Sequence, residues 1–368
     1  MKKKILICWG TRPEAIKLAP LAIAMKRHPK LQPVILESGQ HVELLRPVTR
    51  LFKLRPDYDL RAMTPDQTLA GLSERILSRV APLLKKVRPD CVLIQGDTST
   101  AFLIALAAFY EKIPVGHVEA GLRTDDKYQP FPEEINRRLI TQVADFHFAP
   151  TEIAAKRLAR AGVEKRAILM TGNTGIDALF MMKRALEERK EPPLAVPASG
   201  KIILVTAHRR ESFGKPFESL CRGILAVARA VPEGRIYYPV HLNPNVKRTA
   251  QKMLAGHPRI RLLAPLAYDQ LVYLLMRADV ILTDSGGIQE EAPSFHKPIV
   301  VLRNVTERPE GVRAGFSFVA GQDPARILRM TLRCLEDRSL RARLGRKKNP
   351  YGDGRASSRI LRFLAARL

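Results

Sequence analysis

Short apolar runs alternate with amphipathic segments along the whole chain. Continuous apolar runs predict buried strands, whereas apolar positions repeated every three or four residues predict helices. The predicted strands are residues 5–9, 34–37, 91–95, 115–118, 146–149, 202–206, 236–240, 260–263, 280–283 and 299–302. The clearest predicted helices are residues 15–27, 69–86, 217–230 and 268–277. This alternation predicts an α/β fold with parallel sheets covered by helices on both faces.

The chain is long enough for two domains. At 368 residues it exceeds what one hydrophobic core usually organises, and its strands fall into two blocks. Two seams fit the composition: the proline-rich residues 191–199, or the segment 171–174 after a short strand. A final helix at residues 355–368 follows a turn-rich segment and could pack on either block.

Composition indicates a reduced, soluble, cytoplasmic protein. The apolar content of 46% is typical of globular chains, and the four cysteines show no paired or zinc-like spacing. The apolar stretch after the three N-terminal lysines is too short for a signal peptide, and the longest apolar run, residues 101–109, is too short to span a membrane. We therefore expect no membrane insertion.

The net charge of +26 has two interpretations. A basic surface attracts any polyanion, including nucleic acid. The basic residues are spread over many predicted helices, however, and no nucleic-acid-binding motif accompanies them. We favour an arginine-rich background composition that also helps to recruit a diphosphate, and we expect no nucleic-acid partner.

Two strand–turn–helix segments have the character of phosphate sites. Residues 10–17 (GTRPEAIK) carry Arg12 and Lys17 at a predicted helix start, where exposed N–H groups favour an anion. Residues 283–291 (TDSGGIQEE) place two glycines where the backbone can approach a ligand closely. Ser285, Gly286 and Gly287 are therefore candidate diphosphate contacts and Glu291 a candidate ribose contact; helix-capping turns are the plain alternative.

Acidic residues follow neighbouring predicted strands in the first block. Asp97 comes after residues 91–95, Glu119 ends the next strand, and Glu133 opens a helix together with Glu134. Each alone could be a helix cap or the partner of an arginine. Carboxylates beside a diphosphate repel it, so their grouping indicates that they act on the ligand chemically.

Two histidines of the second block follow strands, and several cofactor motifs are missing. His208 and His241 come after predicted strands, where ligands collect in parallel sheets; a buried, hydrogen-bonded histidine is the alternative. The chain has neither the dinucleotide pattern GxGxxG after a strand nor the ATP pattern GxxxxGK[ST], and the eight histidines lack metal-ligand spacing. We expect no cofactor and no metal.

Together these segments resemble the non-hydrolysing UDP-N-acetylglucosamine 2-epimerases. The matching motifs run in the family's order over nearly the whole chain, which makes the resemblance specific. They are residues 10–17, 96–98, 117–124, 130–137, 171–174, 208–211, 238–244, 284–293, 306–310 and 349–354.

The resemblance implies the GT-B architecture, with two Rossmann-like domains and the active site in the cleft between them. Residues 1–171 and the returning helix 355–368 would form the first domain, and residues 172–354 the UDP-binding domain. The implied activity interconverts UDP-GlcNAc and UDP-ManNAc for surface polysaccharide supply, in a homodimer. The family's catalytic residues fall on Asp97, Glu119, Glu133 and His208. Its UDP contacts fall on Arg12, Lys17, Ser285, Gly286, Gly287, Glu291 and Arg308.

The implied mechanism is elimination of UDP to give 2-acetamidoglucal, followed by re-addition with inversion at C2. Breaking the anomeric bond first gives oxocarbenium character, which acidifies the C2 proton. We expect Asp97 to be one proton-transfer group. The division of the other roles between Glu119 and Glu133 stays open.

The family's second, allosteric UDP-GlcNAc site is only partly matched. Gln40, His41, Arg209 and His241 fit that pattern, whereas Glu43 and Asp66 are acidic where a neutral and a basic residue are expected. The resemblance therefore argues against retained allosteric activation. Three alternative functions stay open at this point: an epimerase of a diacetamido sugar, a GT-B glycosyltransferase, and an inactive sugar-nucleotide sensor or nucleic-acid-binding protein.

Overall fold

The structure is a computed structural model that describes residues 1–39, 42–64, 67–124, 126–209 and 212–368, without the side chains of residues 42–44. Its internal contacts divide the chain into two compact units. Unit 1 comprises Met1–Met181 and Tyr351–Leu368, and unit 2 comprises Met182–Pro350.

Unit 1 contains a parallel sheet of seven strands in the order β3-β2-β1-β4-β5-β6-β7. In chain order these are β1 (Lys3–Trp9), β2 (Leu31–Glu37), β3 (Tyr58–Asp59), β4 (Cys91–Gln95), β5 (Val115–Val118), β6 (Phe146–Ala149) and β7 (Ile168–Met170). The helices are α1 (Arg12–Lys26), α2 (Val42–Leu51), α3 (Leu69–Val87), α4 (Ser99–Tyr110), α5 (Glu133–Val143), α6 (Glu152–Arg160), α7 (Thr174–Glu187) and α15 (Ala356–Arg367), with a 3-10 turn at Lys165–Ala167.

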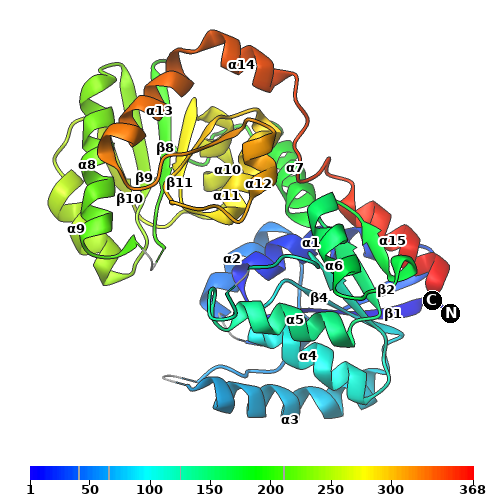
Figure 1. Ribbon diagram of the computed structural model, residues 1–368. Helices are drawn as coiled ribbons and strands as arrows, with labels where there is room; N and C mark the ends of the chain where they lie inside the picture. The colour runs from blue at the N-terminus through cyan, green and yellow to red at the C-terminus, as the bar shows by residue number, and fades with distance from the viewer. Residues whose placement is uncertain (40–41, 65–66, 125, 210–211) are drawn as a thin grey trace. The chain divides into compact units, whose positions relative to one another are not determined.

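The central strands of unit 1 are covered by helices on both faces. Leu6, Cys8, Val92 and Ile94 pack against α3 and α4 in one apolar cluster. On the other face α1 contacts α2 and α15 (Figure 1). A strand buried on both faces is a continuous apolar run, which is why these strands were visible in the sequence.

Unit 2 contains a parallel sheet of six strands in the order β10-β9-β8-β11-β12-β13. In chain order these are β8 (Lys201–Thr206), β9 (Gly234–Pro239), β10 (Ile260–Leu263), β11 (Val280–Thr283), β12 (Ile299–Val301) and β13 (Ser317–Val319). The helices are α8 (Lys215–Ala230), α9 (Pro244–Leu254), α10 (Tyr268–Arg277), α11 (Gly286–Glu291), α12 (Pro309–Arg313), α13 (Pro324–Glu336) and α14 (Arg338–Gly345), with a 3-10 turn at Ala292–Phe295.

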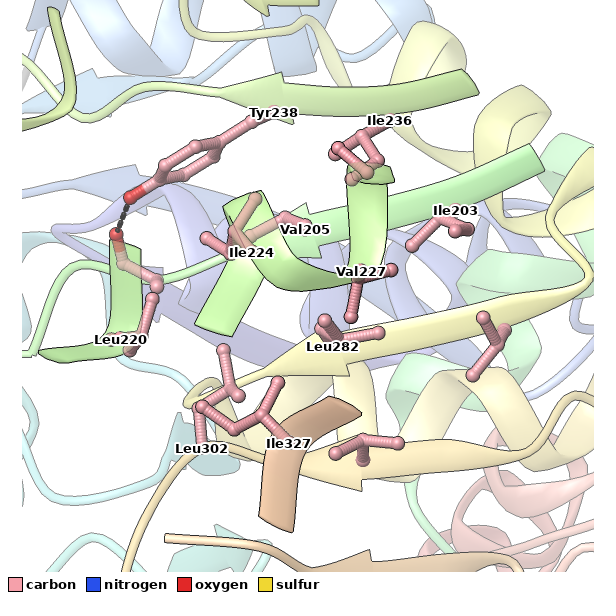
Figure 2. Packing of buried hydrophobic residues seen from close by; sticks show 14 of the residues in the cluster. Ile203, Val205, Leu220, Ile224, Val227, Ile236, Tyr238, Leu282, Leu302 and Ile327 are labelled. Carbon is pink, nitrogen blue, oxygen red and sulfur yellow. Dashed lines mark hydrogen bonds between the residues drawn. The ribbon is translucent and has the colours of Figure 1, made fainter. Parts of the chain in front are cut away.

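Unit 2 has one core on each face of its sheet. On one face Ile203 and Val205 of β8 pack with α8, α9 and α13, as Figure 2 shows for Ile224, Val227 and Ile327. On the other face Ile202 and Leu204 pack with α10 and α11. The predicted α/β class with two parallel Rossmann-like sheets is thus confirmed.

The C-terminal helix α15 packs within unit 1. Oδ1 of Asp177 accepts a hydrogen bond from the backbone N–H of Ser357 at 2.8 Å, and the N–H of Asn173 donates to the carbonyl of Tyr351 at 2.7 Å. The division between the units falls inside α7, between Met181 and Met182, whereas residues 191–199 lie within unit 2. The boundary at 171/172 stays a prediction.

Two further observations bear on the sequence expectations. All four cysteines are free and buried, and burial raises the pKa of the Cys91 thiol. Within the described residues, no helix is long and apolar enough to cross a membrane.

Candidate active site

Glu14 joins the loops that follow β1 and β4 in unit 1. Its Oε2 accepts hydrogen bonds from the backbone N–H groups of Gly10 at 2.9 Å and Thr11 at 2.7 Å, which caps α1. Its Oε1 accepts a hydrogen bond from the hydroxyl of Thr98 at 2.6 Å. Burial raises the pKa of Glu14, although these donors oppose the rise. The loop after β1, which leads into Arg12 at the start of α1, is therefore held against the loop that carries Asp97.

Glu119 lies directly after β5 in a strained backbone conformation. Its φ is +66°, a region that side-chain-bearing residues seldom adopt and that is concentrated at functional sites. Oε2 lies 2.5 Å from Nζ of Lys17 and 2.6 Å from Nε2 of Gln95. The carboxylate is only 4% exposed, so these donors replace water around its charge.

Asp97 follows β4 and pairs with an arginine of α5. Its Oδ2 lies 2.6 Å from Nη2 of Arg137, and its backbone carbonyl accepts a hydrogen bond from the side chain of Asn136. Burial raises the pKa of Asp97, and the charge of Glu133 adds to the rise, while Arg137 and Lys17 oppose it. A carboxyl with a raised pKa and a partly exposed side chain is suited to proton transfer.

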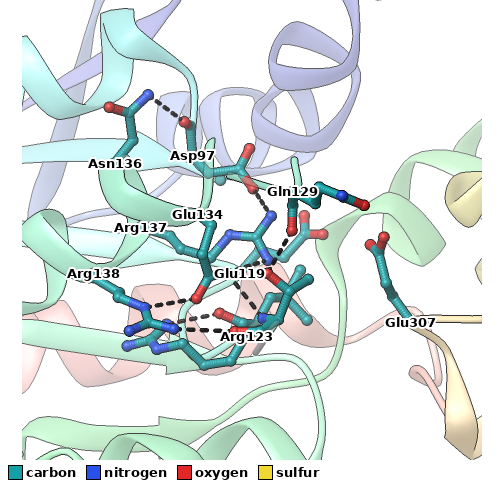
Figure 3. A network of polar contacts seen from close by, with 12 residues as sticks. Asp97, Glu119, Arg123, Gln129, Glu134, Asn136, Arg137, Arg138 and Glu307 are labelled. Atoms are coloured by element: carbon teal, nitrogen blue, oxygen red, sulfur yellow. Dashed lines mark hydrogen bonds and ion pairs between the residues drawn. The ribbon is translucent and has the colours of Figure 1, made fainter. Parts of the chain in front are cut away.

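Glu133 is the first residue of α5, after the cis peptide bonds at Pro130 and Pro132. Its Oε2 is buried and has no hydrogen-bond partner within the part of the chain that the structure describes. Unpaired buried carboxylate oxygens are costly and tend to mark sites that receive a ligand or a proton. Glu134 differs, because it is buried among donors from its own unit (Figure 3).

Unit 1 therefore gathers much of the predicted set. Strands β4 and β5 are neighbours in the sheet, so Asp97 and Glu119 lie at the same edge. Lys17 pairs with Glu119 and acts electrostatically on Asp97, as does Glu133. This edge combines three carboxylates with one ammonium group. Arg12 is half-buried at the first position of α1, above the same end of β1.

In unit 2, Asp284 fixes the loop that carries His208. Strands β8 and β11 are neighbours, with Thr206 paired to Thr283, so Asp284 lies beside the segment after β8. Its Oδ2 accepts hydrogen bonds from the backbone N–H groups of His208 at 2.7 Å and Arg209 at 2.8 Å. The Asp284 side chain is fully buried. The hydroxyl of Tyr238 secures the same loop by donating to the carbonyl of Ala207 at 2.6 Å (Figure 2).

The imidazole of His208 is partly exposed and stacks on that of His241. The ring centroids are 5.2 Å apart and the planes are 9° from parallel. Burial lowers the pKa of His208, His241 and Arg209 lower it further, and Asp284 opposes them. Arg209 and His241 thus lie beside His208. Gln40, His41 and Asp66, together with the Glu43 side chain, lie outside the described residues.

The glycine turn after β11 lies against Arg308. A Cβ on Gly286 would come within 3.1 Å of Nη2 of Arg308, so any larger residue here requires the guanidinium group to shift. Nε of Arg308 lies 2.5 Å from Oε1 of the buried Glu290. Ser285 is the N-cap residue of α11, and Gly287 follows in its first turn. These residues form one group in unit 2.

Further charges and a hydroxyl complete this group. Burial would raise the pKa of Glu307, but Arg308, Arg303 and Arg209 outweigh it and lower the pKa. The guanidinium groups of Arg308, Arg303 and Arg209 therefore all lie close enough to Glu307 to stabilise its charge. Oε1 of Glu291 accepts a hydrogen bond from the hydroxyl of Tyr268 at 3.2 Å, which orients the candidate ribose contact.

No cluster of histidine, cysteine, aspartate and glutamate within the described part of the chain is arranged to hold a metal ion. A reaction without metal or cofactor stays a prediction.

Sequence reasoning missed several residues that support the predicted ones. Glu14, Gln95 and Asp284 each bond to a loop or side chain of the predicted set. Arg137 was covered only by the general expectation that one of the carboxylates pairs with an arginine. Asp284 had a usable signal, because it follows a strand that neighbours the strand before His208. The contacts of Arg137 depend on side-chain directions that the sequence pattern does not specify.

Comparisons with known proteins agree with this arrangement. The family described as UDP-N-acetylglucosamine 2-epimerase matches residues 23–365. The chain is 47% identical to a probable UDP-N-acetylglucosamine 2-epimerase of Ralstonia solanacearum, over 99% of both chains. It is 46% identical to the UDP-N-acetylglucosamine 2-epimerase of Escherichia coli K12, over 98% of both chains.

A solved structure is similar over the same length. The crystal structure of the UDP-GlcNAc 2-epimerase of Neisseria meningitidis bound to UDP-GlcNAc superposes with a TM-score of 0.93 at 41% identity. The match covers 99% of this chain and 100% of that chain. The resemblance that the motifs indicated therefore extends to the whole fold.

Proposed function

Because this chain belongs to the UDP-N-acetylglucosamine 2-epimerase family, we propose that it interconverts UDP-GlcNAc and UDP-ManNAc by inverting C2 of the sugar. The observation that carries the proposal is the grouping of Asp97, Glu119 and Glu133 with Lys17 at one edge of the unit 1 sheet. Grouped carboxylates, one of them with a raised pKa, are typical of a site that transfers protons.

The UDP moiety is bound mainly by unit 2. The Ser285–Gly286–Gly287 turn offers its backbone to the diphosphate, Arg308 supplies charge beside Gly286, and Glu291 binds the ribose hydroxyls. Arg12 and Lys17 contribute charge from unit 1. Fixed cations and N–H groups stabilise the negative charge that develops on the departing diphosphate, which lowers the barrier to breaking the anomeric bond.

The chemistry proceeds by elimination and re-addition. The anomeric C–O bond breaks and its electron pair leaves with UDP. The carbocation-like sugar then loses its C2 proton, and the C1–C2 double bond of 2-acetamidoglucal forms. In the return step a proton is delivered to C2 on the opposite face while UDP adds again at C1. No acceptor and no oxidant enter this sequence.

The side chains of unit 1 move the protons. Asp97 is one proton-transfer group, since its side chain is partly exposed and its pKa is raised by burial. Glu119 and Glu133 stabilise the positive charge at the anomeric carbon and serve the opposite face of C2. His208, whose pKa is lowered by burial, helps to stabilise the leaving diphosphate. Replacing any of the three carboxylates by its amide should decrease kcat by much more than tenfold and leave UDP binding largely intact.

The cellular setting follows from the same reasoning. All four thiols are free and buried, which is typical of proteins of the reducing cytoplasm. We expect a cytoplasmic homodimer that supplies precursors of surface polysaccharide.

A direct assay tests the proposed function. The purified chain is incubated with UDP-GlcNAc alone, and the sugar nucleotides are separated by chromatography. The proposal predicts an equilibrium mixture with UDP-ManNAc in the absence of any acceptor. Unchanged UDP-GlcNAc, or net release of UDP with free sugar, contradicts it.

A further inference from the structure

Glu134, the second residue of α5, is a fully buried carboxylate surrounded by donors (Figure 3). Its side chain is 0% exposed. Oε1 accepts a hydrogen bond from Nε of Arg138 at 2.7 Å, and Oε2 accepts one from the backbone N–H of Thr124 at 2.9 Å. A carboxylate removed from water is stable only when donors surround it, so these contacts fix Glu134 in one position.

Arg137 connects this buried charge to Asp97. Its Nη1 lies 3.4 Å from Oε2 of Glu134, and its Nη2 lies 2.6 Å from Oδ2 of Asp97. The Arg137 side chain is 7% exposed and that of Asp97 is 26% exposed. The guanidinium group is planar and rigid, so holding one of its edges against Glu134 directs the other edge towards Asp97. Of Glu134, Arg137 and Asp97, the side chain of Asp97 is therefore the most exposed to water.

We propose that Glu134 and Arg137 are positioning residues for the reaction: Glu134 orients the guanidinium group of Arg137, which holds the Asp97 carboxylate in the orientation for proton transfer at C2. The inference deepens the proposed function and rests on it, because it gives the neighbours of Asp97 a task in that reaction. Neither residue needs to touch the sugar.

Charged groups from two helices face Asp97. Arg137 and Glu133 lie on α5, and Lys17 lies on α1. Burial and Glu133 raise the pKa of Asp97, whereas Arg137 and Lys17 lower it. Loss of the Arg137 charge therefore raises the pKa of Asp97 further. This shift is a signature that a merely structural role of Arg137 does not produce.

Arg138 provides a matched control on the same helix. Its guanidinium pairs with the same Glu134 carboxylate and donates to the carbonyl of Thr124, and its side chain is 47% exposed. Among the described contacts it reaches Glu134 but not Asp97. If the cluster only stabilised the fold, Arg138→Gln and Arg137→Gln would affect activity in the same way.

The experiment compares the wild type with Arg137→Gln, Arg137→Lys, Glu134→Gln and Arg138→Gln. For each, kcat and KM are measured from pH 5 to 9 in both reaction directions, with UDP affinity by calorimetry and folding by thermal unfolding. A misplaced reacting group can cost about 10²-fold in rate, and we expect a loss of that order in kcat for Arg137→Gln, with KM and UDP affinity nearly unchanged.

The pH profiles carry the decisive signature. In Arg137→Gln the part of the kcat–pH profile that Asp97 governs moves to higher pH. In the reaction direction in which Asp97 accepts a proton this is the acid limb, and in the direction in which it donates one it is the basic limb. Arg137→Lys restores the position of the limb but only part of kcat, because a lysine keeps the charge and loses the rigid fork. Glu134→Gln lowers kcat less than Arg137→Gln. Arg138→Gln acts only through Glu134, so it lowers kcat less than Arg137→Gln and leaves the pH profile unshifted.

Two results overturn the inference, and they are distinguishable. Equal losses in Arg137→Gln and Arg138→Gln, with unshifted profiles, contradict the positioning role alone. A wild type that does not interconvert the two sugar nucleotides contradicts the proposed function, and the inference with it. If Arg137→Gln fails to fold, the profile and kcat of Arg137→Lys decide: full recovery of both contradicts the need for a fixed guanidinium.

Discussion

Nζ of Lys17 lies 2.5 Å from Oε2 of Glu119, although the two residues are 102 positions apart in the chain. Lys17 belongs to the first turns of α1, and Glu119 follows β5 in a left-handed conformation. The pair joins a predicted UDP contact to a predicted catalytic carboxylate. In the proposed function, the same ammonium group neutralises Glu119 before UDP binds and faces the diphosphate afterwards.

The first prediction concerns this pair. Lys17→Met leaves a carboxylate that is 4% exposed without its counter-ion, and breaking a buried pair in this way costs on the order of 3 kcal/mol. Glu119→Gln leaves the cation, whose side chain is 17% exposed and therefore better hydrated. We expect Lys17→Met to lower the free energy of unfolding more than Glu119→Gln, although both lower kcat. Urea denaturation of the two variants measures the difference; the reverse order contradicts this account of the pair.

The second prediction concerns the charge beneath His208. Burial, His241 and Arg209 lower the pKa of His208, and the carboxylate of Asp284 opposes them. Asp284→Asn removes that charge, so the pKa of His208 falls further, and kcat falls because the loop loses two charge-assisted hydrogen bonds. An NMR titration of the His208 ring proton measures the shift.

A matched control for Asp284 lies at the start of the same strand. Asp279 directly precedes β11, whereas Asp284 directly follows it, so the two carboxylates lie at opposite ends of the strand. Oδ2 of Asp279 accepts a hydrogen bond from the backbone N–H of Ile202 at 2.9 Å. Asp279→Asn removes a comparable carboxylate–backbone bond and leaves the pKa of His208 in place. A similar shift in both variants would show that the effect is not local.

The third prediction concerns the close approach of Arg308 to the glycine turn. In Gly286→Ala the new Cβ would lie 3.1 Å from Nη2 of Arg308, so the guanidinium group must move. We expect UDP affinity to fall by up to about tenfold, equivalent to about 1.4 kcal/mol, with little loss of stability. Calorimetric titration with UDP measures it. The control is Gly345→Ala at the end of α14, where a Cβ meets no atom within 4 Å; equal effects of the two substitutions would contradict the role of Arg308.

The fourth prediction concerns pH and stability. Burial lowers the pKa of His117 to about 3 and that of His147 to about 4, and nearby basic groups, Arg123 foremost for His147, add to the effect. The unfolded chain binds these protons near the ordinary value of 6.5, whereas the folded chain does not. Their contribution to stability is therefore fully present above pH 6.5 and is lost as the pH falls towards 3.

The measurement compares variants at several pH values. The melting temperature of the wild type falls between pH 6.5 and 4, partly because of His117. In His117→Asn that fall is shallower, even if the variant is less stable at neutral pH. A slope that does not respond to His117→Asn would mean that other groups govern the acid instability.

Much of the fold could be predicted because its strands are buried on both faces. The predicted strands at residues 91–95, 115–118 and 146–149 agree with β4, β5 and β6 to the residue. The two-residue β3 and the three-residue β13 were missed, because neither is long enough to form an apolar run. They lie at the edges of their sheets, where fewer neighbours are available to bury them.

The place of the candidate residues in the sheet could be predicted, but the contacts between their side chains could not. Residues after strand ends must gather at one edge of a parallel sheet, which brought Asp97 and Glu119 together in the prediction. The pairing of Lys17 with Glu119, and the bridge from Glu134 through Arg137 to Asp97, depend on rotamers and helix orientation. A pattern of residue types carries no information on those, so the supporting network could not be predicted from the sequence.

The most direct measurement of the central claim is proton NMR of UDP-GlcNAc incubated with the chain in D2O. Removal and return of the C2 proton predict anomeric signals of UDP-ManNAc, with solvent deuterium at C2 of the product and, over time, of the remaining substrate. Asp97→Asn should slow both changes together while UDP still binds. UDP-ManNAc that forms without deuterium at C2, or UDP-GlcNAc that stays unchanged in the presence of the folded chain, would contradict the account.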